Sequence, residues 1–475
     1  MLAQAIRLNN FGRNLSWTPA DSFAPRDETE VLSVLDRSRG RRIRVVGRLH
    51  SWSRALVADD VLLDLRHLND IRVDQRGDHV WAEVGAGCQI KHLLIELEKR
   101  AGVTLPSLGL ITEQTLVGAA ATGTHGSGKN SLSHYIAEMR LATYDPETGT
   151  PMIRVIVGGP ELRAARCSLG CLGVVVSVGV WCRPQYQVEE HMRRYQRLDD
   201  VLAAEEQFPL QQFFLIPWLW AFLVQHRREV ATRRSALATL YRCYFFLVFD
   251  VGLHLVLLPL VRWGRRGLVR RFFRRMLPWT VVQRQRVVDR SQAMLVMEHE
   301  LFRHIEIEMF VTRSRIRDAL AYIEDILKYF DGDDAALTSS TRECLGGIGL
   351  LRELDERRGS YTHHYPICVR RVLADDTMLS MASGVGEPYY AVSFISYDRP
   401  EHRRGFLELA EFLSRSMGAL FGARPHWGKI CPVTAEEVVR LYPELSGFRA
   451  VCAAFDPAGV FRNDWLDRVL FGARG

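Results

Sequence analysis

Eleven consecutive residues between Gly118 and Gly128 are the part of this chain that points most directly to chemistry. They read GAAATGTHGSG, so almost every side chain is Gly, Ala, Ser or Thr. Small side chains let a backbone approach a flat or anionic ligand closely, and free backbone N–H groups can then bind phosphate. The segment lacks a GxGxxG pattern after a strand and lacks GxxxxGK, which excludes a Rossmann fingerprint and a P-loop. The alternative is a glycine-rich surface turn.

Two acidic residues and one lysine also have placements that suit chemistry. Glu306 and Glu308 lie on one face of the strand expected over Leu301–Val311, where neighbouring carboxylates can raise the pKa of one of them. The alternative is that Glu306 is solvent-exposed. Lys429 is one of only five lysines and ends the run His426-Trp427-Gly428-Lys429, directly before an apolar segment. That setting argues against a solvated surface lysine.

Two further small-residue turns accompany the glycine-rich segment. Residues 44–51, RVVGRLHS, form a β-rich run that ends in a glycine turn and delivers a histidine. Residues 168–176, SLGCLGVVV, form a second turn that enters a buried strand.

Together these segments resemble the FAD-binding family of vanillyl-alcohol-oxidase (PCMH) type. Within it they resemble the sugar-1,4-lactone oxidases, the group of L-gulonolactone, L-galactonolactone, D-arabinonolactone and alditol oxidases. The match covers residues 14–185 and 290–470, and HWGK and the run DPAGVFRN at 456–463 are its most specific parts. The resemblance implies an FAD-dependent enzyme that oxidises a CH–OH group of a sugar lactone or polyol-like substrate. Hydride would pass to flavin N5, and electrons to O2 or a membrane acceptor.

The resemblance also implies which residues hold FAD. In the family, a histidine in a VGxGHS turn lies against the flavin and often bonds covalently to its 8α-methyl group. Here VGRLHS puts His50 at that place, with Arg48 and Leu49 replacing smaller residues; a covalent link and a histidine that only packs beside the ring both stay open. Lys429 would stabilise the negative charge of the reduced ring. The expected cofactor-binding residues are Val46, Gly47, Arg48, Leu49, His50, Ser51, Ser107, Gly109, Gly118, Thr122, Gly123, Thr124, Gly126, Ser127, Val174, Val175 and Lys429.

Catalytic residues follow from the same resemblance. Glu308 begins EMFVT, which matches a family glutamate pattern with Thr in place of Pro, and it is the first choice for the proton-accepting group. Arg370, in PICVR, matches the arginine of the family's PIEVR. The run YYAVSF places Ser393 where the family's YISVH has a histidine, a departure that puts the sugar-lactone substrate in question. For His125 a structural role is expected, and no metal site is expected. The expected catalytic residues are Glu308, Lys429, Arg370, His426 and Ser393.

The elements that position these residues follow an α+β pattern. At 475 residues the chain is too long for a single core. We expect a two-subdomain FAD-binding PCMH-type domain over 14–185. An α+β cap and C-terminal domain with an antiparallel sheet should follow over 186–475, with a tail at 456–475 that returns to the FAD domain. Helical spacing predicts helices over 28–39, 89–101, 316–329 and 402–417, and β patterns predict strands that include 301–311, 365–372, 378–383 and 389–397.

Residues 206–280 form a hydrophobic and basic insertion in this pattern. Phe208–Val224 and Cys243–Val261 are apolar, and arginines interleaved with Trp and Phe follow. This composition predicts a membrane-inserted helical hairpin with a basic amphipathic helix at the lipid surface, attached from one side rather than spanning. The alternative is a buried hairpin within the cap or a dimer interface.

Composition supports a membrane-associated protein on the cytoplasmic side. Residues 227–275 hold twelve arginines and two acidic residues, within a chain of net charge +7. Nine scattered cysteines without a CxxC pair favour a reducing compartment, and the N-terminus shows no apolar core of a signal peptide. The expected partners are a small sugar-type substrate, O2 or a membrane electron acceptor, and a membrane surface, with no nucleic acid. Two alternatives stay open: a flavin oxidoreductase of a lipid-linked sugar, resembling the decaprenylphosphoryl-ribose oxidase branch, and a non-catalytic membrane-binding protein.

Overall fold

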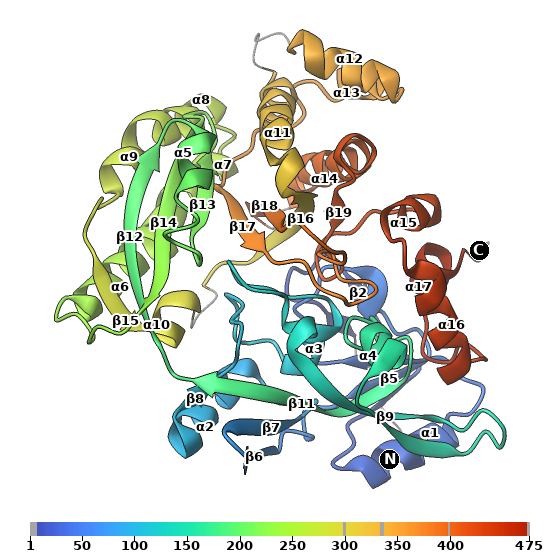
Figure 1. Ribbon diagram of the computed structural model, residues 1–475. Helices are drawn as coiled ribbons and strands as arrows, with labels where there is room; N and C mark the ends of the chain where they lie inside the picture. The colour runs from blue at the N-terminus through green and yellow to red at the C-terminus, as the bar shows by residue number, and fades with distance from the viewer. Residues whose placement is uncertain (1–6, 298–300, 333–336, 398–399, 473–475) are drawn as a thin grey trace.

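The N-terminal part of the chain, at the bottom of Figure 1, forms two larger sheets and a two-stranded sheet of β1 (Leu8–Asn9) and β2 (Ser16–Trp17). The computed structural model describes residues 7–297, 301–332, 337–397 and 400–472. Of the two larger sheets, the smaller is parallel and consists of β3 (Asp21–Phe23), β5 (Val61–Asp64) and β4 (Ile43–Val46). The larger sheet is antiparallel and has the order β10 (Pro151–Ile156), β9 (Ile136–Tyr144), β11 (Val174–Pro184), β7 (His79–Gly85) and β6 (Ile71–Arg76), with β8 (Val103–Thr104) beside β11.

Four helices of this part close its two cores. The helix α1 begins after Asp27, whose carboxylate accepts the Glu30 N–H at 2.8 Å. Thr115 caps α3 in the same way by accepting the Gly118 N–H at 3.1 Å, which holds the start of the glycine-rich segment. The four helices are α1 (Glu28–Arg37), α2 (Ile90–Ala101), α3 (Leu116–Ala121) and α4 (Gly159–Ala165).

The second part is built on an eight-stranded antiparallel sheet, the cap sheet. One face packs against α11 (Ile316–Asp331) and α14 (Pro400–Phe421) around buried Ile305, Ile307 and Met309 of β16. Glu306 and Glu308 alternate with these residues and point to the opposite face. The strand order is β15 (Val287–Arg290), β12 (Gln187–Tyr195), β14 (Ala221–Val230), β13 (Gln212–Ile216), β17 (Ile367–Val372), β18 (Tyr389–Tyr397), β16 (His304–Thr312) and β19 (Arg424–Pro425). The predicted α+β class with an antiparallel cap sheet is confirmed.

The hydrophobic segment differs from its prediction in one half. Phe208–Val224 supplies β13 and the start of β14, in the interior of the cap sheet, so it is no half of a helical hairpin. The sequence pattern of an apolar run that is buried on both faces fits a strand and a helix equally well. Pro209 and Pro217 divide this run into segments that have the length of a strand. The helical segment begins at Ala238. It comprises α6 (Ala238–Phe245), η3 (Phe246–Gly252), α7 (Leu253–Arg262), α8 (Arg266–Arg271), η4 (Phe272–Met276) and α9 (Leu277–Thr280).

The other predicted elements were mostly found, with ends that moved by a few residues. The strand predicted over Met378–Ser383 is wrong, because these buried residues form turns between β17 and β18. The smaller helices are α5 (Leu198–Ala203), α10 (Ser291–Leu295), α12 (Ser339–Gly347) and α13 (Leu351–Glu356).

The C-terminal tail returns to the N-terminal sheets, at the right of the view below α14 (Figure 1). After α15 (Ala435–Leu441) and α16 (Leu445–Phe455), the Asp456 carboxylate accepts the N–H groups of Val460 and Phe461 at 2.8 and 2.9 Å. The Val460 carbonyl then accepts the Ile43 N–H at 2.8 Å, beside β4. Asn463, ahead of α17 (Asp464–Leu466), donates to the Val57 carbonyl at 2.9 Å. Through these hydrogen bonds, the run DPAGVFRN ties the C-terminal part of the chain to residues 43–57 of the N-terminal part.

Candidate active site

Three segments far apart in the sequence meet beside β4. The Gly428 carbonyl accepts hydrogen bonds from the Ser51 hydroxyl at 3.1 Å and the Trp52 N–H at 2.9 Å. A Cβ atom added at Gly47 would lie 2.7 Å from Thr115 Oγ1, and one at Gly118 would lie 2.9 Å from the same atom. The glycine turn, the glycine-rich segment and the HWGK run thus approach one another so closely that the contacts at Gly47 and Gly118 leave no room for a side chain.

These segments enclose a cavity of about 750 Å³ that runs from β4 to the cap sheet. Many residues predicted to bind the cofactor line it: Val46, Gly47, Arg48, Leu49, His50, Ser51, Gly118, Thr122, Thr124, Val175 and Lys429. All five residues predicted to be catalytic line it as well. Ser107, Gly126 and Ser127 instead line a small neighbouring pocket, and in the described chain Gly109, Gly123 and Val174 lie outside the lining. The long cavity between the two parts of the chain has the shape and small-residue wall that a dinucleotide needs.

The turn that carries His50 keeps its backbone despite its larger residues. Leu49 adopts a φ of 57°, the left-handed region where the family's glycine stands, at a cost of about 1–2 kcal/mol. The His50 ring stacks on Phe11 with a 5.0 Å centroid distance and an 18° interplanar angle. Burial lowers the pKa of His50 to about 4, so the imidazole is neutral at pH 7 and retains a nucleophilic nitrogen.

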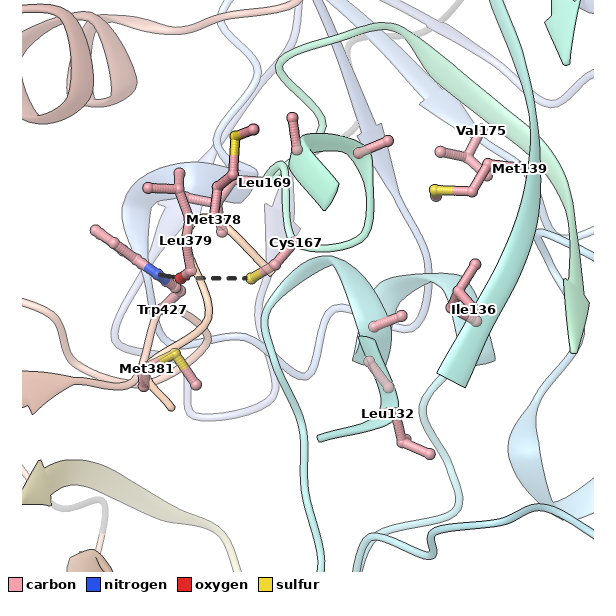
Figure 2. Packing of buried hydrophobic residues seen from close by; sticks show 14 of the residues in the cluster. Leu132, Ile136, Met139, Cys167, Leu169, Val175, Met378, Leu379, Met381 and Trp427 are labelled. Atoms are coloured by element: carbon pink, nitrogen blue, oxygen red, sulfur yellow. Dashed lines mark hydrogen bonds between the residues drawn. The ribbon is translucent and has the colours of Figure 1, made fainter. Parts of the chain in front are cut away.

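Trp427 anchors the HWGK run from behind. Its indole is buried and donates to the Leu379 carbonyl at 2.6 Å, and the Cys167 thiol donates to the same carbonyl at 3.8 Å (Figure 2). Its ring also lies 5.2 Å from that of Tyr442. Met378, Met381 and Cys167 surround this contact in the core (Figure 2). The buried turns around Leu379, where a strand was predicted, therefore hold the run that carries Lys429.

Glu308 and His125 share one proton in the middle of the cavity wall. His125 Nδ1 lies 2.9 Å from the Gly126 carbonyl, which can only accept, so this nitrogen carries a hydrogen. His125 Nε2 lies 3.4 Å from Glu308 Oε2, and that contact is favourable only with a proton between the two groups. Burial opposes ionisation of Glu308, but the charge and hydrogen bond of His125 outweigh it and hold the pKa of the carboxyl below its usual value.

The second oxygen of Glu308 is free. Glu308 Oε1 is buried and has no hydrogen-bond partner among the residues that the structure describes. The nearest cation is Arg370, whose Nη1 lies 3.9 Å away and whose Nε donates to Gln212 at 3.1 Å. A buried carboxylate oxygen without a partner is costly, and its cost is relieved by a ligand that donates a hydrogen bond.

Lys429 forms a second charged group next to the first. Its ammonium contacts the Glu306 carboxylate and lies 4.5 Å from the centre of the Trp52 ring. Glu306 is buried rather than solvent-exposed, and it also accepts from the Ser393 hydroxyl. Burial opposes ionisation of Glu306, yet the Lys429 charge keeps the pKa of Glu306 low. His304 Nε2 approaches the same carboxylate at 3.8 Å.

His426 completes the polar wall as a neutral donor. Its Nδ1 accepts the Gly428 N–H at 2.9 Å, so its hydrogen is on Nε2. Burial lowers the pKa of His426 to about 3. Ligand atoms of His125, Glu308 and His426 lie within 4.8 Å of one another, close enough for a metal ion. Because the positive charges of Arg370 and Lys429 lie beside these three residues, we expect the three residues to bind a proton rather than a metal ion.

The cap sheet turns from polar to apolar across the cavity. In register, Glu308 lies opposite Ser393, Ser393 opposite Cys368, Cys368 opposite Phe214, and Phe214 opposite Leu223. All five residues line the cavity. The sequence reasoning did not single out Cys368, although the family's PIEVR has a glutamate where PICVR has this cysteine. It also missed the partnership of His125 with Glu308, which depends on a contact between two domains.

The helical segment covers the apolar end of this row. Eleven of its residues line the cavity. Six are aromatic or aliphatic (Tyr241, Phe245, Phe246, Phe249, Leu253 and Leu277), and the other five are Thr239, Arg242, Cys243, Asp250 and His254.

Comparisons with known proteins decide the family. The chain is 53% identical to a protein called long-chain alcohol oxidase from an uncultured marine euryarchaeote, over 99% of this chain and 98% of that protein. Residues 19–148 match the FAD binding domain family, and residues 253–469 match the D-arabinono-1,4-lactone oxidase family. The chain belongs to the FAD-dependent aldonolactone oxidase family. It is therefore an FAD-dependent oxidoreductase that acts on CH–OH groups, and the predicted family and cofactor are confirmed.

Two further comparisons give a more distant relative and the fold. The family member called L-gulono-1,4-lactone dehydrogenase from Mycobacterium tuberculosis is 28% identical, over 95% of this chain and 96% of its own length. A solved structure called solvent-stable cholesterol oxidase has the same fold, with a TM-score of 0.71 and 16% sequence identity over 98% of this chain and 97% of its own.

Proposed function

We propose that this enzyme oxidises the terminal CH–OH group of a long-chain alcohol to an aldehyde, in place of the sugar lactone predicted from the sequence. The observation that carries the proposal is the gradient across the cap sheet, from Glu308 to Phe214 and Leu223. A polyol needs polar partners along its whole length, whereas the row of the cap sheet that leads away from Glu308 and Ser393 ends in the apolar side chains of Phe214 and Leu223. The name of the 53% identical relative supports the same substrate class.

The residues of the chain divide the reaction between them. The unpartnered Glu308 Oε1 accepts the hydroxyl hydrogen of the substrate, while Oε2 keeps its hydrogen bond to His125, which holds the carboxylate in place. Arg370 and His426 orient the substrate oxygen at this carboxylate. Bound FAD supplies the two-electron acceptor that takes the hydride from the carbinol carbon. Lys429 would place its positive charge beside the bound flavin; Glu306 holds its ammonium, and the Ser393 hydroxyl in turn donates to Glu306.

The cofactor-binding part of the proposal assigns FAD to the cavity wall formed by residues 46–51, 118–124 and Val175. The neutral His50 is the residue that would bond to the flavin ring. We place the boundary between the FAD-binding domain and the cap after residue 185, between β11 and β12, with the 456–475 tail as a part of the FAD side. The final electron acceptor we propose is O2.

We further propose that the enzyme lies on a membrane surface through its helical segment. Ala238–Arg262 is one helical stretch of 25 residues with a mean hydropathy of 2.1, and only 17% of its most apolar window is buried. Its inner face lines the cavity, while Leu240, Leu247 and Leu255 are exposed on the outside. Withdrawing this helix to span a bilayer would remove one wall of the cavity, so attachment from one side fits the fold better.

A substrate panel tests the proposed function. FAD-loaded enzyme is supplied with primary alcohols of increasing chain length and with L-gulono-, L-galactono- and D-arabinono-1,4-lactone, while aldehyde and H2O2 are measured. We expect kcat/KM to rise with alcohol chain length and to remain low for all three lactones. A preference for any lactone over the long alcohols would contradict the substrate class, and aldehyde formed without H2O2 would contradict O2 as acceptor.

A further inference from the structure

A second group of polar side chains lies in the apolar part of the cavity and has no role in the chemistry above. It consists of Asp250, His254, Tyr365 and Tyr397, and we call it the far polar cluster. All four residues line the same cavity as Glu308. Most of their neighbours along the wall are apolar: Ile216, Phe249, Leu253, Leu277, Phe302 and Ile395. On the side toward Glu308, the cluster borders His304 and Glu306.

The hydrogen bonds within the far polar cluster leave the O–H group of one tyrosine available to donate to a ligand. His254 Nδ1 lies 3.0 Å from the Tyr397 hydroxyl, and His254 Nε2 lies 3.5 Å from the Tyr365 hydroxyl. Burial lowers the pKa of His254 to about 4, so the neutral ring offers one N–H and one lone pair. One phenol therefore donates to the ring and the other accepts from it. The accepting phenol keeps its own O–H, because burial raises the pKa of both tyrosines.

The cluster is fixed in place by its surroundings. The His254 ring stacks on Phe302 with a 4.0 Å centroid distance and a 20° interplanar angle. The Tyr397 side chain is buried, and its ring stacks on His364 with a 9° interplanar angle. Asp250 precedes His254 by one turn, and its negative charge is among the causes that raise the pKa of Tyr365. The phenols are thus held in an environment that disfavours an anion.

The register of the cap sheet sets the distance between the two polar ends of the cavity. Ser393 lies opposite Glu308, and Tyr397 lies opposite His304, four residues further along the same strands. Four residues on one face of a strand correspond to about 13 Å. Between these two ends, Ile395 of β18 lies opposite Glu306 of β16, whose carboxylate is held by Lys429, and Ile216 and the helical segment add apolar wall.

We propose that the far polar cluster is a second substrate subsite, which binds a hydroxyl group carried on the alkyl chain at that distance from the reacting carbinol. This inference rests on the proposed function. A simple aliphatic chain would leave the spare phenol O–H without an acceptor in a largely apolar surrounding, which is costly. A hydroxyl can accept from the phenol and is neutral, whereas a carboxylate would meet the charge of Asp250. The preferred substrate is therefore a long-chain diol rather than a simple alcohol.

The test compares α,ω-diols with primary alcohols of the same length on the FAD-loaded enzyme. A symmetric diol has two reactive ends, so a twofold higher kcat/KM is expected without any subsite. With the subsite, the ratio of diol to alcohol should reach about tenfold at one chain length, since one good hydrogen bond contributes on the order of a factor of ten. The ratio should return to about two for diols that are too short to reach the cluster, by the same arithmetic.

Variants locate the preference. The double variant Tyr365→Phe/Tyr397→Phe should lower the ratio at the optimal length to about two, because it removes both hydroxyls and keeps both rings. Tyr361→Phe is the matched control, since that phenol contacts His363 at 3.3 Å and lies outside the cavity lining; it should keep the full ratio.

The outcomes separate this inference from the proposed function. A ratio near two at every length in the wild-type enzyme would overturn the subsite alone, and so would a full diol preference in the double variant. If the enzyme oxidises neither the simple alcohols nor the diols, the proposed function is overturned, and the subsite with it.

Discussion

Two glutamates on β16 meet histidines in the same way, and this repetition explains how a buried strand carries two carboxylates. His125 and His304 each place Nδ1 near a backbone carbonyl, at 2.9 and 3.3 Å, so their hydrogens are assigned there. Each then presents Nε2 to a carboxylate, Glu308 or Glu306. The carboxylates stay ionised because a proton or the Lys429 ammonium offsets the cost of burial.

Replacing His125 tests its link to Glu308. In His125→Gln, burial raises the pKa of Glu308 with less opposition, so the carboxylate protonates at higher pH. We expect the acid limb of the kcat/KM profile to move up by about one to three pH units, because the reaction needs ionised Glu308. His67→Gln, at an exposed position, is the control and should leave the limb in place. An acid limb that stays put or moves down in His125→Gln would contradict the shared proton.

Replacing His50 tests the covalent link. Wild-type protein precipitated with acid should remain yellow and give a fluorescent band in a denaturing gel under ultraviolet light. His50→Ala should release its flavin into the supernatant. A colourless wild-type precipitate would show that His50 only packs beside the ring.

At the residue scale, the sequence predicted the groups that stand in short local motifs. Glu308, Arg370 and Lys429 line the cavity together, as the motif matches indicated. The role of His125 was not predicted, since it depends on a partner 183 positions away that only the folded chain brings within 3.4 Å. The sequence PICVR shows Cys368 where the family's PIEVR has a glutamate, but the effect of this replacement on the substrate depends on the pairing of Cys368 with Phe214.

At the element scale, the helical segment has two faces with different tasks. The inner face forms the wall of the cavity, and the outer face carries exposed apolar residues followed by an exposed arginine-rich turn and helix. Trp263 is 68% exposed and Trp279 is 89% exposed, and both lie among Arg262, Arg271 and Arg275. Tryptophan and arginine together are typical of a face that lies in the headgroup region of an anionic bilayer.

Removing the two tryptophans tests membrane attachment. The variant Trp263→Ser/Trp279→Ser should bind vesicles that contain phosphatidylserine about tenfold more weakly than wild type in a flotation assay. Wild-type binding should also weaken with salt, because the arginines contribute electrostatically. Trp181→Ser, at a half-exposed tryptophan of β11, is the control and should float like wild type. Equal flotation of both variants would place the attachment elsewhere or exclude it.

The sequence did not decide whether the two apolar segments form strands or helices, and the reason is physical. Phe208–Val224 and Cys243–Val261 are both apolar, yet the first becomes interior strands and the second becomes a helix. Periodicity cannot separate a strand buried on both faces from a buried helix, and only pairing with β12 and β17 decides the first case.

At the scale of the whole molecule, the site exists only where the two parts and the C-terminal tail meet. The glycine turns come from the N-terminal sheets, the carboxylates from the cap sheet, and Lys429 from a loop anchored by Trp427. The boundary between the parts after residue 185 stays a prediction, which rests on the separate pattern of strands and turns that each part carries. The sequence did not predict the length of the cavity, since the apolar wall forms from segments that are distant along the chain.

The most direct test of the account is the anaerobic reduction of bound FAD by a long-chain primary alcohol. Stopped-flow absorbance measures the rate of this reduction. The account predicts rapid bleaching in the wild-type enzyme and a rate constant about 10²- to 10⁴-fold lower in Glu308→Gln, which keeps the shape of the side chain but cannot take the proton. Unchanged FAD content in the variant secures the comparison. Bleaching at the wild-type rate in Glu308→Gln would contradict the central role of the free Glu308 oxygen.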